Sequence, residues 1–268
     1  MLNKLNTLHK PDIVYPTGGN PLLVLCDDLQ DWVCKHSRES SKLVNELLGS
    51  SFAVHWNLHT PEISLITVKK EHIPAHLQGV NFSKSCFGSK YIRKSKELDH
   101  PSIGMFKDYN FKRKIENKDD FLLICLFDIW LSNEDRNHNN TNLLLDFSDI
   151  NKIRFTVFDH DSIFNSNNLG LGIYQINEFD SLLYSELGSI LYKKKQSLVN
   201  AVDNIIKKFY ICISACEENL RQIIDLIPDD WGVDRDYLER QLRNNLFAKE
   251  WLRECENNFR IFVQTNII

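Results

Sequence analysis

The sequence has no long uninterrupted apolar run, no internal repeat and no low-complexity tract. Its longest apolar stretch covers residues 121–131, and Asp128 interrupts it. This stretch is too short to cross a bilayer, so we expect no membrane association. Residues 1–16 contain no continuous apolar segment of the kind found in secretory signals, so we expect no export by that route.

The sequence also lacks a strong excess of one charge. A net charge of −4 gives no general attraction to nucleic acid or anionic lipid, so no direct nucleic-acid binding is expected. A local basic patch stays open, as in KDYNFKRK at 107–114. With 43% hydrophobic and 25% charged residues, the composition is that of an ordinary globular protein. A chain of 268 residues can form one large domain or two lobes.

Cysteine pairs of the Cys-x-x-Cys type are absent as well. The seven cysteines are an odd number, and several stand in apolar surroundings, for example Cys26 and Cys125. Such cysteines usually behave as small buried hydrophobic residues, which favours a reducing, cytoplasmic compartment. The histidine pairs His55/His59 and His72/His76 have no cysteine motif to complete them, which disfavours a structural zinc site.

The first part of the chain is rich in predicted strands. Runs at 22–26, 32–36 and 63–70 have β-type composition, and a Thr-Gly-Gly-Asn turn precedes the first of them. Residues 39–56 carry apolar side chains at helical spacing and predict an amphipathic helix. We therefore predict a small β-rich lobe with one helix over residues 1–90.

The second part of the chain, residues 91–268, is predicted to be mainly helical. Residues 119–131 begin with two aspartates and are apolar on nearly every side, which indicates a buried helix. A β hairpin is expected over 143–159. Three further helical runs then follow, at 181–193, 197–227 and 236–259. The fold class is therefore α+β, with two lobes in this order along the chain.

A dense polar segment, NEDRNHNNTN at 133–142, separates the buried helix from the hairpin. A kinase-type phosphotransferase needs such groups between its lobes: one carboxylate for the attacking hydroxyl, and an amide and a second carboxylate for Mg²⁺. Asp135 and Asn140 have the spacing of a protein-kinase catalytic loop, and Asp159 ends the following strand. Lys35 lies in a predicted strand, where kinases carry their phosphate-binding lysine, and Glu46 on the next helix is placed to pair with it.

These segments resemble the HipA-like kinases, the family that includes the toxin kinase of a bacterial toxin–antitoxin pair. The matching stretches are GGNPLLVLCDD, WVCKH, LVNELLGSSFA, FDIWLSNEDRNHNNTNLLLD and FTVFDHDSIF, with a weaker match at IPDDWG. The resemblance implies a protein-kinase-like fold and an ATP- and Mg²⁺-dependent transfer of phosphate to a Ser or Thr hydroxyl of a protein. A toxin or stress-response role would fit this family.

The resemblance also assigns roles to single residues. It implies Asp135 as the catalytic carboxylate, and Asn140 and Asp159 as metal ligands. It places Lys35 on the nucleotide phosphates. The implied phosphate loop comprises Gly18, Gly19 and Asn20.

Two features depart from the family pattern. The first is Asp161, which stands where a glycine is expected. The second is that the extra N-terminal subdomain of the full-length toxin kinase has no counterpart in this sequence, so we do not expect an antitoxin partner of the familiar type. The Asp-Arg-x-x-x-Asn form of the loop also resembles that of lipid kinases, which leaves the substrate open.

Two alternative functions and one candidate modification site stay open at this point. The chain could be a nucleotide-binding pseudokinase that serves as an interaction module. Alternatively, Asp159 and Asp161 could be the Asp-x-Asp pair of a haloacid-dehalogenase-type phosphohydrolase. Thr17, beside the glycine turn, is a candidate for autophosphorylation, because HipA-like kinases modify themselves near this loop.

Overall fold

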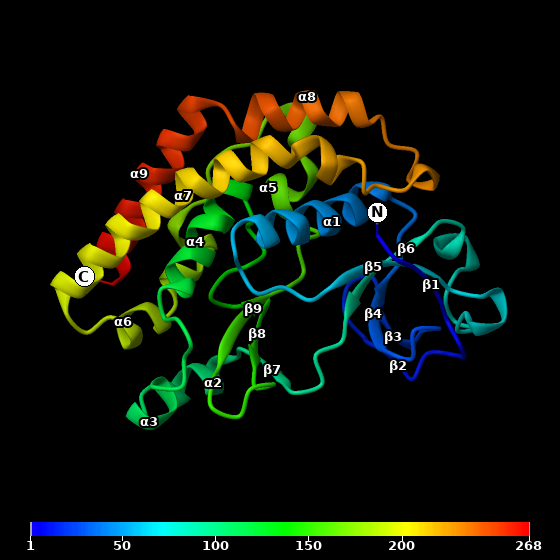
Figure 1. Cartoon of the computed structure of the whole chain (residues 1–268), viewed down its shortest axis with the longest axis horizontal. Helices are drawn as coiled ribbons and strands as arrows, with labels where there is room; N and C mark the ends of the chain where they lie inside the picture. Colours follow the sequence, from blue (N-terminus) through cyan, green and yellow to red (C-terminus); the bar gives the residue numbers. More distant parts are fainter. Residues whose placement is uncertain (1, 268) are drawn as a thin grey trace.

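A six-stranded sheet forms the N-terminal end of the protein in the computed structural model, in which residues 2–267 are described (Figure 1). Its spatial order is β1 (Lys4–Asn6), β5 (Ile63–Thr67), β6 (Cys86–Lys90), β4 (Asp31–Lys35), β3 (Leu22–Leu25) and β2 (Ile13–Val14). Strands β1 and β5 are parallel, and the other neighbours are antiparallel. Side chains alternate between the faces of a strand. Trp32 and Cys34 of β4 therefore join a small core on one face, while Lys35 points to the other.

Helix α1 (Ser40–His55) joins this sheet to the helical part of the molecule. The sequence predicts an amphipathic helix here, but the helix is buried without interruption from Leu43 to Ala53. The reason is that α1 packs against β6 on one side and against a long C-terminal helix, α7 (Lys195–Ile224), on another. Figure 1 shows α1 lying along the helical layer.

The rest of the chain is mainly helical. Its other helices are α2 (His100–Met105), α3 (Tyr109–Lys112), α4 (Asp120–Leu131), α5 (Ile163–Asn167), α6 (Leu187–Leu191), α8 (Arg235–Leu246) and α9 (Lys249–Asn266). Helix α4 is buried at every position from Phe121 to Leu131, which explains its apolar sequence. The predicted helical run 236–259 is interrupted at Phe247 and Ala248, so that it contributes to two helices.

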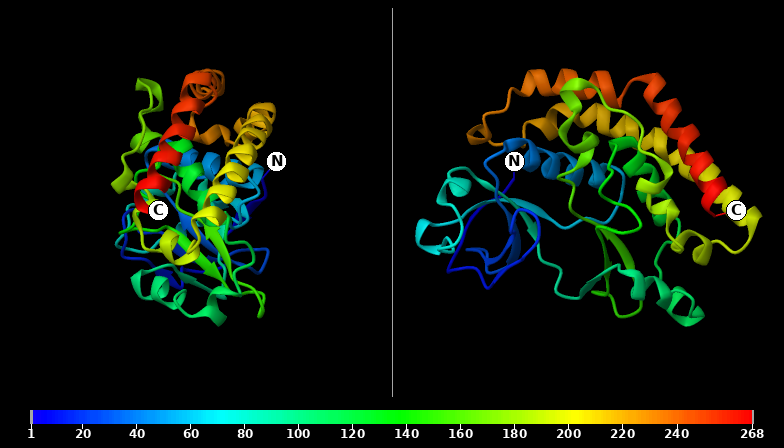
Figure 2. Two further views of the ribbon diagram at one scale, coloured as in Figure 1. Left: turned by 90° about the vertical axis from the view of Figure 1, so that its left-hand side faces the viewer. Right: turned by 180° about the vertical axis from the view of Figure 1, so that it is seen from behind.

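A second, three-stranded antiparallel sheet lies below the helical layer and beside the first sheet (Figures 1 and 2). It consists of β7 (Ser95–Glu97), β8 (Leu143–Asp146) and β9 (Arg154–Val157). Leu143 pairs with Val157, and Asp146 pairs with Arg154, so the hairpin predicted from the sequence is present. The α+β class, with a β-rich first part and a helical second part, is thereby confirmed.

Two large hydrophobic side chains connect α1 with the main core. The indole of Trp56 stacks on Trp130 of α4 at 5.3 Å between ring centroids, and Phe52 meets the same ring edge-on at 5.2 Å. All seven cysteines are buried as free thiols. Within residues 2–267, none of the helices has the length and apolar character that crossing a membrane requires.

Candidate active site

The glycine turn connects β2 to β3. Its backbone closes through a hydrogen bond from the Asn20 amide to the Thr17 carbonyl oxygen, at 3.0 Å. Gly19 has φ +83° and Asn20 has φ +47°, left-handed values that Gly and Asn tolerate best. His36, next to Lys35 on the neighbouring strand, approaches the Asn20 carbonyl with Nε2 at 3.1 Å. Burial lowers the pKa of His36, so its neutral form with a proton on Nε2 can donate this bond and hold the turn against β4.

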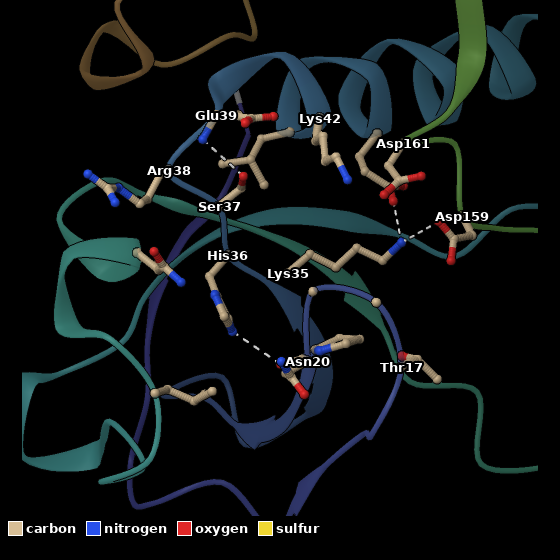
Figure 3. A pocket seen from close by; sticks show the side chains of 17 residues that line it. Thr17, Asn20, Lys35, His36, Ser37, Arg38, Glu39, Lys42, Asp159 and Asp161 are labelled. Carbon is tan, nitrogen blue, oxygen red and sulfur yellow. Dashed lines mark hydrogen bonds and ion pairs between the residues drawn. The ribbon is translucent and has the colours of Figure 1, made fainter. Parts of the chain in front are cut away.

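Lys35 lies between two carboxylates. Its Nζ donates to Glu46 of α1 and, at 2.7 Å, to Oδ1 of Asp159 just beyond β9 (Figure 3). The second carboxylate oxygen of Glu46 accepts the His160 amide at 3.1 Å. Three segments distant in the sequence therefore meet at one ammonium group.

Burial and charge act in opposite directions on this cluster. Burial lowers the pKa of Lys35, but the charges of Glu46 and Asp159 outweigh it and leave that pKa raised. Burial raises the pKa of Glu46, and the charge of Lys35 opposes the shift. Burial also acts to raise the pKa of Asp159, but Lys35 reverses this and the net shift is downward. Lys35 is consequently a permanent cation, and Asp159 is an anion at neutral pH.

The close approach of α1 to Asp159 depends on a glycine. A Cβ atom at Gly49 would lie 2.4 Å from the Cβ of His160, far inside van der Waals contact. His160 is fully buried, so it has no free space into which to move. Asp159 itself has φ +58°, which turns the chain sharply at the end of the hairpin.

Asp135 is oriented by two amide side chains of its own loop. Its Oδ2 accepts hydrogen bonds from Nδ2 of Asn140 at 3.0 Å and from Nδ2 of Asn142 at 2.8 Å. Its Oδ1 has no donor within residues 2–267. Asn137 has a structural task, because its Oδ1 accepts the backbone amides of Asn139 and Asn140.

A buried arginine ties this loop to the rest of the site. Arg136 is 0% exposed and forms an ion pair with Asp128 of α4. It also donates to the Asn142 carbonyl at 3.2 Å and to the Phe158 carbonyl at 2.6 Å. Since Phe158 precedes Asp159, one guanidinium fixes the Asp135 loop relative to the strand end that carries Asp159.

The glycine turn and the Lys35 cluster face each other across a cleft of about 360 Å³ (Figure 3). Of the residues predicted for the site, six line it: Gly18, Gly19, Asn20, Lys35, Glu46 and Asp159. Thr17, Lys42 and Asp161 also line this cleft. Asp135 and Asn140 do not line it, and their loop is linked to the Asp159 segment by the Arg136 contacts and by a bond from the Phe158 amide to the Asn142 carbonyl.

Each of the two residues predicted as metal ligands has a side-chain oxygen without a hydrogen-bond donor in the described chain. Asn140 directs its amide nitrogen to Asp135, which leaves its Oδ1 without a partner in the described chain. Asp159 bonds Lys35 through Oδ1 alone, so Oδ2 is also available within residues 2–267. One amide and one carboxylate suit Mg²⁺, which retains several waters and takes phosphate oxygens as further ligands. Within residues 2–267, no group of three or more His, Cys, Asp or Glu side chains forms a metal cage.

A family model described as HipA-like kinase matches residues 17–260. The chain belongs to the HipA-like kinase family. A solved structure, the crystal structure of a Helicobacter pylori proinflammatory kinase CtkA, matches with a TM-score of 0.53 at 13% identity and covers 98% of each chain. At this identity the likeness shows a shared kinase-like fold and nothing finer. No curated protein matches the chain.

Several residues of this HipA-like kinase site were not found from the sequence. They are Arg136, His36 and Asn45. The Nδ2 atom of Asn45 donates to three acceptors: the Asp161 carbonyl at 2.9 Å, the Ile163 carbonyl at 3.2 Å and Asn167 Oδ1 at 2.9 Å. These bonds attach α1 to the segment of α5, in which φ is left-handed from Phe164 to Asn167. Two features of the sequence could have indicated these residues. Asp128 stands alone in an apolar helix and requires a buried cation, and Asn45 is next to Glu46.

Proposed function

We propose that this HipA-like kinase transfers the γ-phosphoryl group of ATP to a Ser or Thr hydroxyl of a protein, with Mg²⁺ as cofactor. The observation that carries the proposal is the bonding of Lys35 Nζ to both Glu46 and Asp159 at a cleft wall opposite the glycine turn. A fixed cation facing exposed backbone amides is the arrangement that nucleotide phosphates require.

The proposed roles follow from these positions. Gly18 and Gly19 present backbone amides to the phosphates, while the Asn20 amide closes the phosphate loop on Thr17. No atom lies within 4 Å of the Cβ positions of the two glycines. Lys35 binds phosphate oxygens, and Glu46 keeps its ammonium group in place. The free oxygens of Asn140 and Asp159 would hold the magnesium ion, which would neutralise phosphate charge.

Asp135 acts on the acceptor hydroxyl. The two amides on its Oδ2 fix the carboxylate and leave Oδ1 to accept the hydroxyl proton. As that proton moves to Oδ1, the hydroxyl oxygen bonds to the γ-phosphorus, the bond to the β–γ bridging oxygen breaks, and ADP leaves. The protein contributes positioning and charge stabilisation, which supply most of the catalysis in phosphoryl transfer.

A comparison of three variants tests the proposal. With labelled ATP, Mg²⁺ and a panel of lysate proteins, Asp135→Asn and Asn140→Ala should abolish transfer, while Asp161→Ala should retain most of it. A phosphohydrolase that uses Asp159 and Asp161 should show the reverse pattern and should cleave an aryl phosphate without ATP. An inactive Asp161→Ala protein together with a fully active Asp135→Asn protein would overturn the proposal.

Three further measurements bear on the same proposal. Binding of ATP without transfer to any protein, or to the chain itself, would identify a pseudokinase. Intact mass after incubation with ATP tests modification of Thr17, which lines the cleft. A Thr17→Ala protein that gains phosphate as readily as the wild type would remove Thr17 as the site. Phosphoproteomics on cells that express wild type or Asp135→Asn would reveal the substrate and any toxin or stress-response role.

A further inference from the structure

An exposed cluster of aromatic rings lies beside the Asp135 loop. His138, three residues after Asp135, meets Tyr184 at 5.0 Å between ring centroids, and Phe179 meets the same tyrosine at 4.9 Å. The Phe179 carbonyl oxygen is 3.2 Å from Nδ1 of His138 and accepts a bond from it when that nitrogen carries the proton. Phe179 is 53% exposed and Tyr184 is 45% exposed. We call His138, Phe179 and Tyr184 the aromatic patch.

The segment that carries these rings is well anchored. Phe179 and Tyr184 lie on two consecutive 3-10 turns, Glu178–Asp180 and Leu182–Tyr184. Asn177 caps the first turn, since its side chain accepts the Phe179 amide at 2.9 Å. Leu182 and Leu183 are buried in the main core. The same turns that bury these leucines hold Phe179 and Tyr184 outward, so the exposure of the rings is set by the fold.

The surroundings of the aromatic patch are acidic. Four carboxylates belong to its two segments: Glu134, Asp135, Glu178 and Asp180. Within residues 2–267, none of the four forms an ion pair. The exposed phenol of Tyr174 has a raised pKa because of Glu134 and, to a smaller extent, Asp180, so both segments present negative charge to the same place.

We propose that the aromatic patch and the carboxylates of Glu134, Glu178 and Asp180 form a docking surface for an arginine- or lysine-rich segment of the protein substrate. The proposal rests on the proposed function, because it places the acceptor hydroxyl at Asp135. Guanidinium groups stack on aromatic faces and pair with carboxylates, so one cationic segment satisfies both features of the surface. Aromatic rings also stack on nucleobases, but unpaired carboxylates repel a phosphate backbone and disfavour that occupant.

Matched peptides test the docking surface. One labelled peptide has a central serine flanked by arginines, and its twin has glutamates at the same positions. Anisotropy without ATP should show the basic peptide binding at least about ten-fold more tightly. Phe179→Ser and Tyr184→Ser should each weaken this binding severalfold and raise KM for the basic peptide, while KM for ATP stays unchanged. The controls are Ile211→Ser, an exposed apolar residue of α7, and Asp12→Lys, an exposed charge near the six-stranded sheet.

A charge reversal makes the test specific. In the variant that combines Glu178→Lys with Asp180→Lys, the acidic peptide should bind more tightly than the basic one. If these residues had only a structural role, the variant would bind both peptides more weakly and to the same extent. Equal binding of the two peptides, or binding that no patch variant alters, overturns the docking surface. Tighter binding of a single-stranded oligonucleotide than of the basic peptide also overturns it. If patch-dependent peptide binding is present but no phosphate is transferred, the proposed kinase function fails and the docking surface stands.

Discussion

Lys35 is the residue on which the proposed nucleotide site depends most directly. It is the counter-ion of Glu46 and Asp159, and without it Asp159 would lack its cationic partner. The uncompensated charge of Asp159 would repel the phosphates of a nucleotide. Removal of the ammonium group therefore takes away the proposed phosphate contact and makes the remaining site less attractive to anions.

Lys35→Met should lower kcat/KM for ATP by roughly 10- to 100-fold, since a hydrogen bond to a charged group contributes about 1.5–3 kcal/mol. Circular dichroism should show an unchanged fold. Lys90→Met is the matched control, because Lys90 is also a strand lysine but is ion-paired at the surface with Glu62. ATP affinity and rate that stay at wild-type values in Lys35→Met would refute the assignment of Lys35.

Gly49 is a second critical residue, for steric reasons. Gly49→Ala introduces a methyl group 2.4 Å from the Cβ of buried His160. Overpacking of this kind costs about 1–3 kcal/mol, which urea unfolding can measure. Because His160 follows Asp159, transfer activity should fall as well.

Gly104→Ala serves as the control for Gly49. Gly104 is also in a helix, α2, but no atom lies within 4 Å of its Cβ position. This substitution should be neutral or stabilise the protein by up to about 1 kcal/mol through helix propensity. Equal stability of the Gly49→Ala and wild-type proteins would contradict the packing argument.

At the scale of elements, the ion pair between Arg136 and Asp128 connects the Asp135 loop to helix α4. Both side chains are almost fully buried, at 0% and 1% exposure. Burial raises the pKa of Asp128 to about 6, the charge of Arg136 acting in the opposite direction. The pair costs desolvation free energy, and its benefit is the fixed position of the loop relative to Phe158.

Arg136→Met should destabilise the protein by about 3–5 kcal/mol, because it leaves Asp128 as an unpaired buried carboxylate. Arg136→Met combined with Asp128→Leu should recover much of that stability but not the activity, since the loop loses its bond to Phe158. Arg243→Met breaks an exposed pair with Glu239 and should change stability by no more than about 1 kcal/mol. If the double variant is no more stable than Arg136→Met alone, the buried charge is not the cause.

At the scale of the whole molecule, we propose a division into an N-lobe of residues 1–90 and a C-lobe of residues 91–268. It is supported by the course of the chain, which leaves the six-stranded sheet after Lys90 and enters the three-stranded sheet at Ser95. Helix α1 belongs to the first lobe by sequence but packs against α7 and stacks Trp56 on Trp130. The two lobes therefore share one continuous hydrophobic core.

Because of this shared core, the full chain should unfold in a single cooperative transition in urea. A fragment of residues 1–90 should not fold independently, since it would expose Leu47, Phe52 and Trp56, which are 0% exposed in the intact protein. Circular dichroism and tryptophan fluorescence of the fragment and the full chain provide the measurement. Two separate transitions in the full chain, or a folded fragment, would show that the lobes are energetically independent.

Local residue patterns were sufficient to predict much of the fold. The alternation in β4, the apolar run of α4 and the β8–β9 hairpin are properties of short segments, and hydrophobic periodicity reports such properties directly. The order of motifs from the glycine turn to Asp159 could also be recognised in the sequence, because the Asp135 loop and its flanking elements are contiguous in the chain. The kinase family followed from that order.

Only the tertiary structure decided which distant groups meet. Asn45 donates to carbonyl groups more than a hundred residues away, Gly49 is required by the position of His160, and the aromatic patch forms when Phe179 and Tyr184 reach His138. Such contacts depend on how helices and sheets pack, and side-chain periodicity carries no information about the partner across an interface. The sequence by itself determined the elements and the chemical groups of this kinase, and packing determined their mutual geometry.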